Sequence, residues 1–295
     1  MEKAVALGNF DGVHKAHRKI LNLTAKKAKE KNLIATAFLF KDHPMAVLKK
    51  GDFRYIMQNS VKEQKIREAG IEEVIFTETT PEILALSPED FVFKVLKERL
   101  SAKVIVAGYN YTFGKGGKGD SALLSKLCQE CSIEAVILDK EELLGSAISS
   151  SRIREYIQNG DMQEANALLG GPYTIYGTVT KGKQLGRRIG FPTANIEFEP
   201  YMLIPRRGVY KSVAAIEGKN YPAITNIGIN PTIENAAVRA ECHILYFEKD
   251  IYGKEIEIGL IEKIRDEIKF DSIEELKKQI EKDKNYVLNS LEEVL

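Results

Sequence analysis

A short segment in the second half of the chain combines residue types that suit phosphate and metal binding. It covers residues 182–195, reads GKQLGRRIGFPTAN, and contains Gly182, Gly186, Arg187, Thr193 and Asn195. Its glycines let backbone N–H groups converge on an anion, because no Cβ blocks the approach, and arginine suits phosphate oxygens. Thr193 and Asn195 each offer a hard oxygen, which Mg²⁺ accepts beside a nucleotide phosphate. By glycine count alone a basic surface turn is the better interpretation, since such patterns match by chance.

A second segment, residues 8–17, reads GNFDGVHKAH and comes between a short apolar stretch and an amphipathic helix. His14 and His17 are three residues apart, so both can face one side of the first helical turn. That turn presents free N–H groups and a positive dipole end to an anion. The pair therefore predicts hydrogen bonds to a transferring phosphoryl group. A solvated helix start is the plain alternative, and a metal pair is weaker because no acidic third ligand is adjacent.

The first half of the chain must position the histidine pair, and its pattern predicts alternating strands and helices. Apolar strands are expected at residues 4–7, 33–40, 73–77, 103–107 and 133–138. Helices are expected at residues 14–31, 60–69, 88–100 and 121–131, with an irregular stretch at 41–59. This order implies a parallel sheet covered on both faces. Ligands bind beyond the carboxyl ends of such strands, where the loops 8–14, 41–59 and 108–120 lie.

The second half of the chain predicts a different architecture. After short helices at 149–159 and 161–168, the sequence Gly170-Gly171-Pro172 marks the expected domain boundary. Strand-like segments follow at residues 173–179, 209–216, 221–227, 239–246 and 255–264. No long helix interrupts them, so an antiparallel barrel is expected, closed by one helix from Ser272. The predicted domains are residues 1–170 and 171–295.

Composition narrows the function classes. The 295 residues are 44% hydrophobic and 29% charged, with a net charge of +1, which is typical of a globular protein and argues against a general nucleic-acid binder. No apolar run approaches membrane-spanning length, so a cytoplasmic protein without membrane partners is expected. Cys128 and Cys131 form a C-x-x-C inside an expected helix. Ordinary thiols are a better interpretation than a zinc or redox site.

The 182–195 segment resembles the G-x-x-x-G-R-x-x-G-F-P-T-A-N signature of riboflavin kinases, which in bacteria usually form the C-terminal module of a bifunctional riboflavin kinase/FAD synthetase. The resemblance implies that Thr193 and Asn195 bind the metal, and that ATP contacts Gly182, Gly186 and Arg187. Residues 239–244 read RAECHI and resemble the family's E-x-H segment, which selects Glu241 as catalytic base. His243 points to the same face of that strand and is interpreted as a structural hydrogen-bonding residue. Residues 226–232 resemble N-I-G-x-x-P-T, and residues 263–267 resemble K-I-R-x-E, which assigns Arg265 to flavin binding.

The 8–17 segment resembles the G-x-F-D-G-x-H-x-G-H box of FAD synthetases, with Ala16 where the family has glycine. The resemblance makes His14 and His17 catalytic and assigns ATP binding to Gly8, Asn9, Phe10 and Asp11. Residues 108–120 resemble the flavin loop G-x-D-F-x-F-G-x-x-x-x-G, with Asn110 and Tyr111 as departures, so flavin contacts are expected from Asn110, Tyr111 and Phe113. Residues 148–154 resemble I-S-S-T-x-I-R, which assigns ATP phosphates to Arg154.

The resemblance covers nearly the whole chain and implies an enzyme with two activities. The expected fold is a nucleotidyltransferase-like (Rossmann-like) α/β parallel-sheet domain followed by an antiparallel β-barrel riboflavin kinase domain with a C-terminal helix. ATP would phosphorylate riboflavin to FMN, and ATP would then adenylylate FMN to FAD with release of pyrophosphate, both with Mg²⁺. Two alternatives stay open: a riboflavin kinase with a weak or inactive adenylyltransferase domain, and a flavin-sensing regulator without turnover. The oligomeric state is left open.

Overall fold

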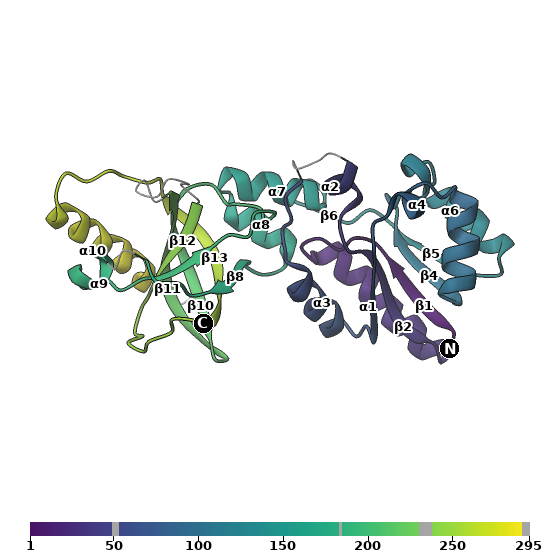
Figure 1. Cartoon of the computed structure of the whole chain (residues 1–295), viewed down its shortest axis with the longest axis horizontal. Coiled ribbons are helices and arrows are strands. Elements are labelled where there is room, and N and C mark those ends of the chain that lie inside the picture. Colours follow the sequence, from purple (N-terminus) through teal and green to yellow (C-terminus); the bar gives the residue numbers. More distant parts are fainter. Residues whose placement is uncertain (49–52, 183–184, 230–237, 291–295) are drawn as a thin grey trace. The chain divides into compact units, whose positions relative to one another are not determined.

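The computed structural model describes residues 1–48, 53–182, 185–229 and 238–290 of the chain. The chain divides into two compact units, Met1–Ser150 and Ser151–Leu295. The first unit contains a parallel sheet, and the second contains an antiparallel sheet and a long helix near its C-terminal end (Figure 1). The two architectures predicted from the sequence are thereby confirmed.

The parallel sheet has the strand order β3-β2-β1-β4-β5. Its strands are β1 Lys3–Leu7, β2 Ile34–Phe40, β3 Glu73–Thr77, β4 Ala102–Gly108 and β5 Glu134–Leu138. Alternate residues of the central strands enter two separate cores: Val5 and Leu7 pack on one face, and Ala4 and Ala6 on the other. Burial on both faces explains why these strands are continuous apolar runs in the sequence.

The helices of the first unit follow the predicted alternation, with two differences. They are α1 Lys15–Lys31, α2 Pro44–Leu48, α3 Asn59–Glu68, α4 Pro81–Leu84, α5 Pro88–Asp90, the π-helix η1 Phe91–Arg99, the 3₁₀ turn η2 Lys115–Gly117 and α6 Ser121–Glu130. The first difference is a set of short helical segments in stretches where no helix was expected, namely α2, α4 and η2. The second is η1, where Leu100 N–H donates to the carbonyl of Val95, five residues earlier, at 3.0 Å. Apolar spacing predicted a helix here but did not distinguish the wider π turn.

The position of the ligand-binding edge follows from the strand order. From β1 the chain proceeds through β2 to β3 on one side, and β4 and β5 lie on the other side of β1. The connection therefore reverses direction between β1 and β4, which makes their carboxyl ends the topological switch point. The loops that begin at Gly8 and at Tyr109 leave the sheet at this point.

The second unit is a six-stranded antiparallel sheet with the order β8-β13-β10-β11-β12-β9. Its strands are β8 Tyr173–Thr178, β9 Ala194–Glu197, β10 Gly208–Ile216, β11 Lys219–Ile229, β12 Val238–Ile244 and β13 Glu255–Arg265. The two edge strands meet, because Thr180 N–H donates to the Asn195 carbonyl at 2.8 Å. At this seam a Cβ on Gly177 would lie 2.5 Å from the Ile196 side chain. Glycine thus lets the sheet close into a nearly complete barrel.

Helices flank this barrel. They are α7 Ser150–Asn159, α8 Met162–Leu169, α9 Leu185–Ile189 and α10 Ile273–Asn289, and a short hairpin of β6 Glu142–Leu143 and β7 Ser146–Ala147 precedes α7. Ser272 caps α10 by accepting from the Glu275 N–H at 3.2 Å. At the other end of α10, the buried Lys211 donates to the Ser290 carbonyl at 3.0 Å. Both ends of α10 are therefore held.

The compact units divide 20 residues earlier than the boundary expected at 170/171. The reason is α8, whose Met162, Ala165, Leu168 and Leu169 are buried. The Asn166 side chain donates to the Leu260 and Ile261 carbonyls of β13 at 2.8 and 3.2 Å, and accepts from the Tyr173 N–H at 2.7 Å. The helix α8 therefore belongs structurally to the barrel, and the limits of the two catalytic domains stay a prediction.

Two further observations concern membrane-spanning helices and the cysteines. Among the described residues, no helix combines the length and apolar character needed to cross a bilayer. Cys128 is buried in the core under the sheet and Cys131 is half-buried, both as free thiols. Burial raises the pKa of the Cys128 thiol to about 12, with a smaller effect from Cys131. A reactive thiolate is not favoured there.

Candidate active sites

The histidine pair lies at the first turn of α1. His14 is the N-cap: its Nδ1 accepts from the His17 N–H at 3.2 Å, and its backbone is extended. The two imidazoles stack with ring centroids 3.5 Å apart, and the edge of Phe10 contacts His17 at 5.3 Å. His14 is 3% exposed, whereas His17 is half-buried. The predicted juxtaposition of the pair is thus present, and packing fixes its orientation.

The turn before the pair has unusual backbone conformations. Phe10, Gly12 and Val13 have φ values of 47°, 85° and 40°, in the left-handed region that residues with a Cβ rarely adopt. Phe10 and Val13 are fully buried, and this packing compensates for the backbone cost. A Cβ on Gly8 would lie 3.1 Å from the Phe10 ring. A side chain at residue 8 would therefore require the Phe10 ring to shift by a few tenths of an ångström.

Asp11 holds the neighbouring loop to this turn. Its carboxylate accepts from the Ile56 N–H at 3.1 and 3.2 Å and is 3% exposed. Ser150 Oγ donates to the Asp11 carbonyl at 2.9 Å. The loop after β2 and the segment at residue 150 are thereby fixed around the turn, while the assignment of Asp11 to ATP stays a prediction.

The loop after β4 carries the expected flavin contacts. Asn110 is exposed and Tyr111 is half-buried, and the Tyr111 ring stacks on Phe113 with centroids 6.0 Å apart. Phe113 is only 5% exposed and packs against Phe91 in the core. Phe113 also exchanges backbone hydrogen bonds with Gly119 at 3.0 and 2.9 Å. Phe113 thus anchors the loop in the core, and Asn110 and Tyr111 are the better placed candidates for a ligand.

Arg154, the expected clamp for ATP phosphates, lies on α7 and is half-buried. It belongs to the second compact unit, whereas the histidine pair belongs to the first. Its proximity to His14 and His17 therefore stays a prediction.

In the barrel, the candidate residues for the kinase site lie opposite one another on neighbouring strands. The strand registers place Asn195 of β9 opposite Glu241 of β12, and Glu241 opposite Asn226 of β11. Residues directly opposite on antiparallel strands point to the same face. His243 follows Glu241 by two residues, so it shares that face and lies opposite Ile224. The predicted base and the predicted metal ligand Asn195 are therefore neighbours on one surface of the barrel.

A cavity of about 270 Å³ covers this surface. Its polar lining is Thr193, Asn226, Glu241, His243, Arg265, Glu267 and Asp283, and its apolar lining includes Val209, Ile224, Phe270, Leu276 and Ile280. The apolar side chains of α10 form one wall, and the polar row of β12 forms another. A pocket with an apolar wall and a few convergent polar groups suits an aromatic ligand with a polar tail.

Two glycines of the 182–195 segment allow close packing near the polar side chains of the cavity. A Cβ on Gly182 would lie 2.7 Å from the Asn195 amide, and a Cβ on Gly186 would lie 2.3 Å from the Phe191 carbonyl oxygen. Phe191 N–H donates to the Gly186 carbonyl at 2.8 Å. These glycines therefore leave room for the Asn195 amide and the Phe191 carbonyl, and their contact with ATP stays a prediction. Arg187 is exposed on α9, and Lys183 and Gln184 lie outside the described residues.

His243 joins β12 to the segment before β9. Its Nδ1–H donates to the Pro192 carbonyl at 2.8 Å, and its ring meets Phe191 edge-on at 5.5 Å. Burial lowers the pKa of His243 below its ordinary value, against a smaller opposing effect of the Pro192 carbonyl. A lowered pKa favours the neutral form of the imidazole at pH 7.

Arg265 lies in the pocket lining, but its guanidinium is held by the protein. Its Nε lies 3.1 and 3.2 Å from the two carboxylate oxygens of Asp283, and a terminal nitrogen lies 2.8 Å from one of them. Asp283 is 3% exposed and also accepts from Gln279 at 2.9 Å. This ion pair fastens α10 to β13 beside the cavity. A flavin contact of Arg265 stays a prediction.

Sequence reasoning missed Asp283, and it included Glu267 only as the last residue of the K-I-R-x-E resemblance, without a role. Asp283 continues the apolar stripe of α10 between Ile280 and Val287. A carboxylate at a core-facing position of a helix is the signal that could have found it, because such a group needs a buried partner. Glu267 lies over Gly228, where a Cβ would be 2.1 Å from its carboxylate. That contact joins segments far apart in the sequence, and no local pattern indicates it.

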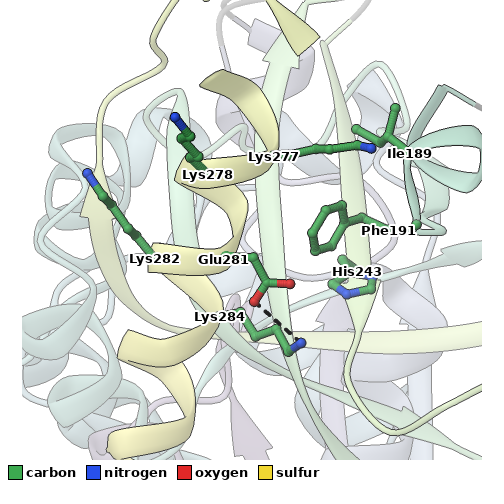
Figure 2. A pocket seen from close by; sticks show the side chains of 9 residues that line it. Ile189, Phe191, His243, Lys277, Lys278, Glu281, Lys282 and Lys284 are labelled. Carbon is green, nitrogen blue, oxygen red and sulfur yellow. Dashed lines mark ion pairs between the residues drawn. The ribbon is translucent and has the colours of Figure 1, made fainter. Parts of the chain in front are cut away.

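A second groove lies beside the cavity and has Ile189, Phe191 and His243 in common with it. Its volume is about 650 Å³, and its other wall consists of Lys277, Lys278, Glu281, Lys282 and Lys284 of α10. Figure 2 shows Lys277 extending toward Ile189, while Lys278 and Lys282 point away from the groove. Glu281 and Lys284 form an ion pair at 3.5 Å. Most of these cations are therefore on a solvated helix face.

Both units thus contain groups suited to phosphate at places where ligands commonly bind, namely the switch point of the parallel sheet and the cavity of the barrel. A chain with two such sites, one at a parallel-sheet switch point and one in a barrel pocket with a carboxylate, has the design of a nucleotide-dependent transferase with two active sites. Family models agree: the FAD synthetase model matches residues 1–152, and the riboflavin kinase model matches residues 169–291. The chain belongs to the family of bifunctional riboflavin kinase/FMN adenylyltransferases.

Individual relatives support this membership. The chain is 37% identical over 286 residues to the bifunctional riboflavin kinase/FMN adenylyltransferase of Listeria monocytogenes, covering 96% of this chain and 90% of the relative. It is 33% identical to that of Escherichia coli, covering 95% and 90%. A solved structure from Streptococcus pneumoniae, described as a macrolide-efflux protein, superposes with a TM-score of 0.89 at 32% identity, covering 98% of this chain and 94% of that one. The chain is an enzyme of flavin synthesis that makes FMN from riboflavin and FAD from FMN.

Proposed function

We propose that the barrel phosphorylates riboflavin with Glu241 as the catalytic base. The carboxylate takes the proton of the terminal ribityl hydroxyl while that oxygen attacks the γ-phosphorus of ATP, and ADP leaves. The observation that carries this assignment is the row Asn195–Glu241–Asn226 across three strands, in which Glu241 and Asn226 line the cavity. The apolar wall from α10 would hold the isoalloxazine ring, so that the ribityl chain extends toward Glu241.

The residues around Glu241 fit a divalent metal ion. Thr193 and Asn195 supply hard oxygens, and Gly182 leaves the Asn195 amide uncovered where any Cβ would touch it. When bound, Mg²⁺ would neutralise the negative charge that develops on the phosphate oxygens. Thr193, Asn195 and the glycines therefore hold and orient the phosphates, and Glu241 handles the proton.

We propose that the first unit transfers the adenylyl group of ATP to FMN. The FMN phosphate attacks the α-phosphorus in line and pyrophosphate leaves, so no protein nucleophile is required. Because His14 Nδ1 accepts the His17 N–H, the proton of a neutral His14 is on Nε2, which can donate to a phosphate oxygen. His17 stacks on His14 and adds a second donor. The pair and the N-terminal turn of α1 would stabilise charge on the transferring phosphoryl group.

The proposal also covers the binding partners of the enzyme, its cellular location and the limit of its kinase domain. Its partners are the small molecules ATP, riboflavin and FMN, and neither nucleic acid nor a membrane is involved. The near-zero net charge supports the first exclusion. A cytoplasmic location is proposed with it. The kinase domain would include the barrel and α10, with its N-terminal limit between Ser151 and Gly171.

The assignment of the kinase to the second unit is tested with two fragments. Fragment 151–295 is expected to convert riboflavin and ATP to FMN and to form no FAD. Fragment 171–295 lacks α8 and is expected to lose ~3 kcal/mol or more in its free energy of unfolding, because buried side chains and the Asn166 hydrogen bonds are removed. Denaturant titrations and chromatography of the flavins are the measurements. An inactive fragment 151–295, beside an active full chain, would refute the assignment.

A further inference from the structure

The pairing between β9 and β12 stops beside the proposed kinase site. Its last paired row joins Ala194 and Cys242, so the same register puts Thr193 opposite His243 in the next row. Thr193 nevertheless lies outside β9, and the preceding Pro192 has no backbone N–H to donate. The segment that carries Thr193 therefore leaves the sheet next to the proposed kinase site, so the backbone ladder does not fix the position of Thr193.

The His243 side chain bridges this gap. Its Nδ1–H donates to the Pro192 carbonyl at 2.8 Å, in the row after the backbone ladder has ended. Its ring also meets the edge of Phe191, which itself is 8% exposed and hydrogen-bonded to the Gly186 carbonyl at 2.8 Å. The imidazole thus ties the approach to Thr193 to β12.

The same strand carries the proposed base. Glu241 and His243 are two residues apart on β12 and point to the same face, and both line the cavity. A shift of the Pro192–Thr193 segment along or away from β12 would therefore change the separation between Thr193 and Glu241. Displacements of about 1 Å between reacting groups can reduce rates by roughly 100-fold.

We infer that His243 is a positioning residue for riboflavin phosphorylation: its hydrogen bond to Pro192 sets Thr193 at the correct distance from Glu241. The inference rests on the proposed roles of Thr193 and Glu241. In this role the imidazole touches neither substrate nor metal. It acts through the Pro192 carbonyl and requires only an N–H donor at the position of Nδ1.

The test compares two variants of the full-length enzyme. His243→Asn keeps an N–H donor near the position of Nδ1, whereas His243→Leu removes it and keeps an apolar side chain against Phe191. Riboflavin phosphorylation is measured against Mg²⁺ concentration at saturating ATP and riboflavin. The leucine variant is expected to need about tenfold more Mg²⁺ for half-maximal rate and to have a lower kcat, while the asparagine variant stays within about threefold of wild type. FAD formation from FMN should be unchanged in both.

Phe247→Leu is the matched control for lost barrel packing. Phe247 packs edge-on against Tyr221 at 5.1 Å and lines neither the cavity nor the lysine groove. It is expected to lower the thermal midpoint with no change in Mg²⁺ dependence. The inference is overturned if His243→Leu behaves like this control, or if leucine and asparagine impair phosphorylation equally. A wild-type enzyme that forms no FMN would instead refute the proposed function, and the inference with it.

Discussion

Glu241→Gln is expected to lower FMN formation from riboflavin by roughly 100- to 10,000-fold. Glutamine keeps the shape of the side chain and its position opposite Asn195 and Asn226, but it cannot accept the hydroxyl proton. Because the loss is chemical, riboflavin binding should change little. The measurement is a steady-state rate of FMN formation, with riboflavin affinity measured separately by fluorescence.

The same variant contains its own control. FAD formation from supplied FMN should persist, because the histidine pair belongs to the other compact unit. A second control is Glu281→Gln, which removes an exposed carboxylate on α10 and should leave both rates near wild type. If Glu241→Gln phosphorylates riboflavin at nearly the wild-type rate, Glu241 is not the base.

His17→Ala is expected to reduce FAD formation from FMN and ATP by about 100-fold or more. The substitution removes a donor to the transferring phosphoryl group and the ring that stacks on His14. The backbone N–H of residue 17 remains, so the cap of α1 by His14 Nδ1 can be retained. Initial rates of FAD formation at saturating FMN provide the measurement, and riboflavin phosphorylation should be unaffected.

Ala16→Gly should be measured in the same FAD-forming assay, because Ala16 is the clearest departure from the FAD synthetase pattern. Its methyl group lies in the first turn of α1 and is partly buried, and alanine favours the helix more than glycine does. We expect a change below about tenfold, or less than about 1.4 kcal/mol in barrier. An inactive wild type that Ala16→Gly restores would contradict this expectation and favour the alternative of a kinase with an inactive adenylyltransferase domain.

Much of the fold could be predicted because its signals are local. The apolar runs of β1 to β5 and the change to closely spaced strand patterns after Pro172 indicated a parallel sheet and then a barrel. The extent of the second unit could not be predicted in this way. Gly170 and Gly171 look like a linker, but Asn166 bonds across them to Tyr173 and to β13. Such contacts join segments that local patterns treat as separate.

The candidate sites were predictable where their members are close in the sequence. Thr193 and Asn195, or His14 and His17, are near neighbours whose spacing alone puts them on one side of an element. The meeting of Asn195 with Glu241 depends on the register of β9 against β12, which packing and closure of the barrel determine. The aromatic type of Phe113 suits a flavin, but its ring is buried against Phe91, so its flavin contact stays a prediction. Only the tertiary structure shows which candidate residues meet in a site and which are buried in the core.

A time course with the purified wild-type chain tests the central claim most directly. Riboflavin, ATP and Mg²⁺ are incubated with the enzyme, and the flavins are separated by chromatography at intervals. The account predicts that FMN appears first and is then converted to FAD, with release of ADP and pyrophosphate. Accumulation of FMN without FAD would contradict the second activity. Riboflavin that is bound but unchanged would contradict both activities and indicate a flavin-sensing regulator.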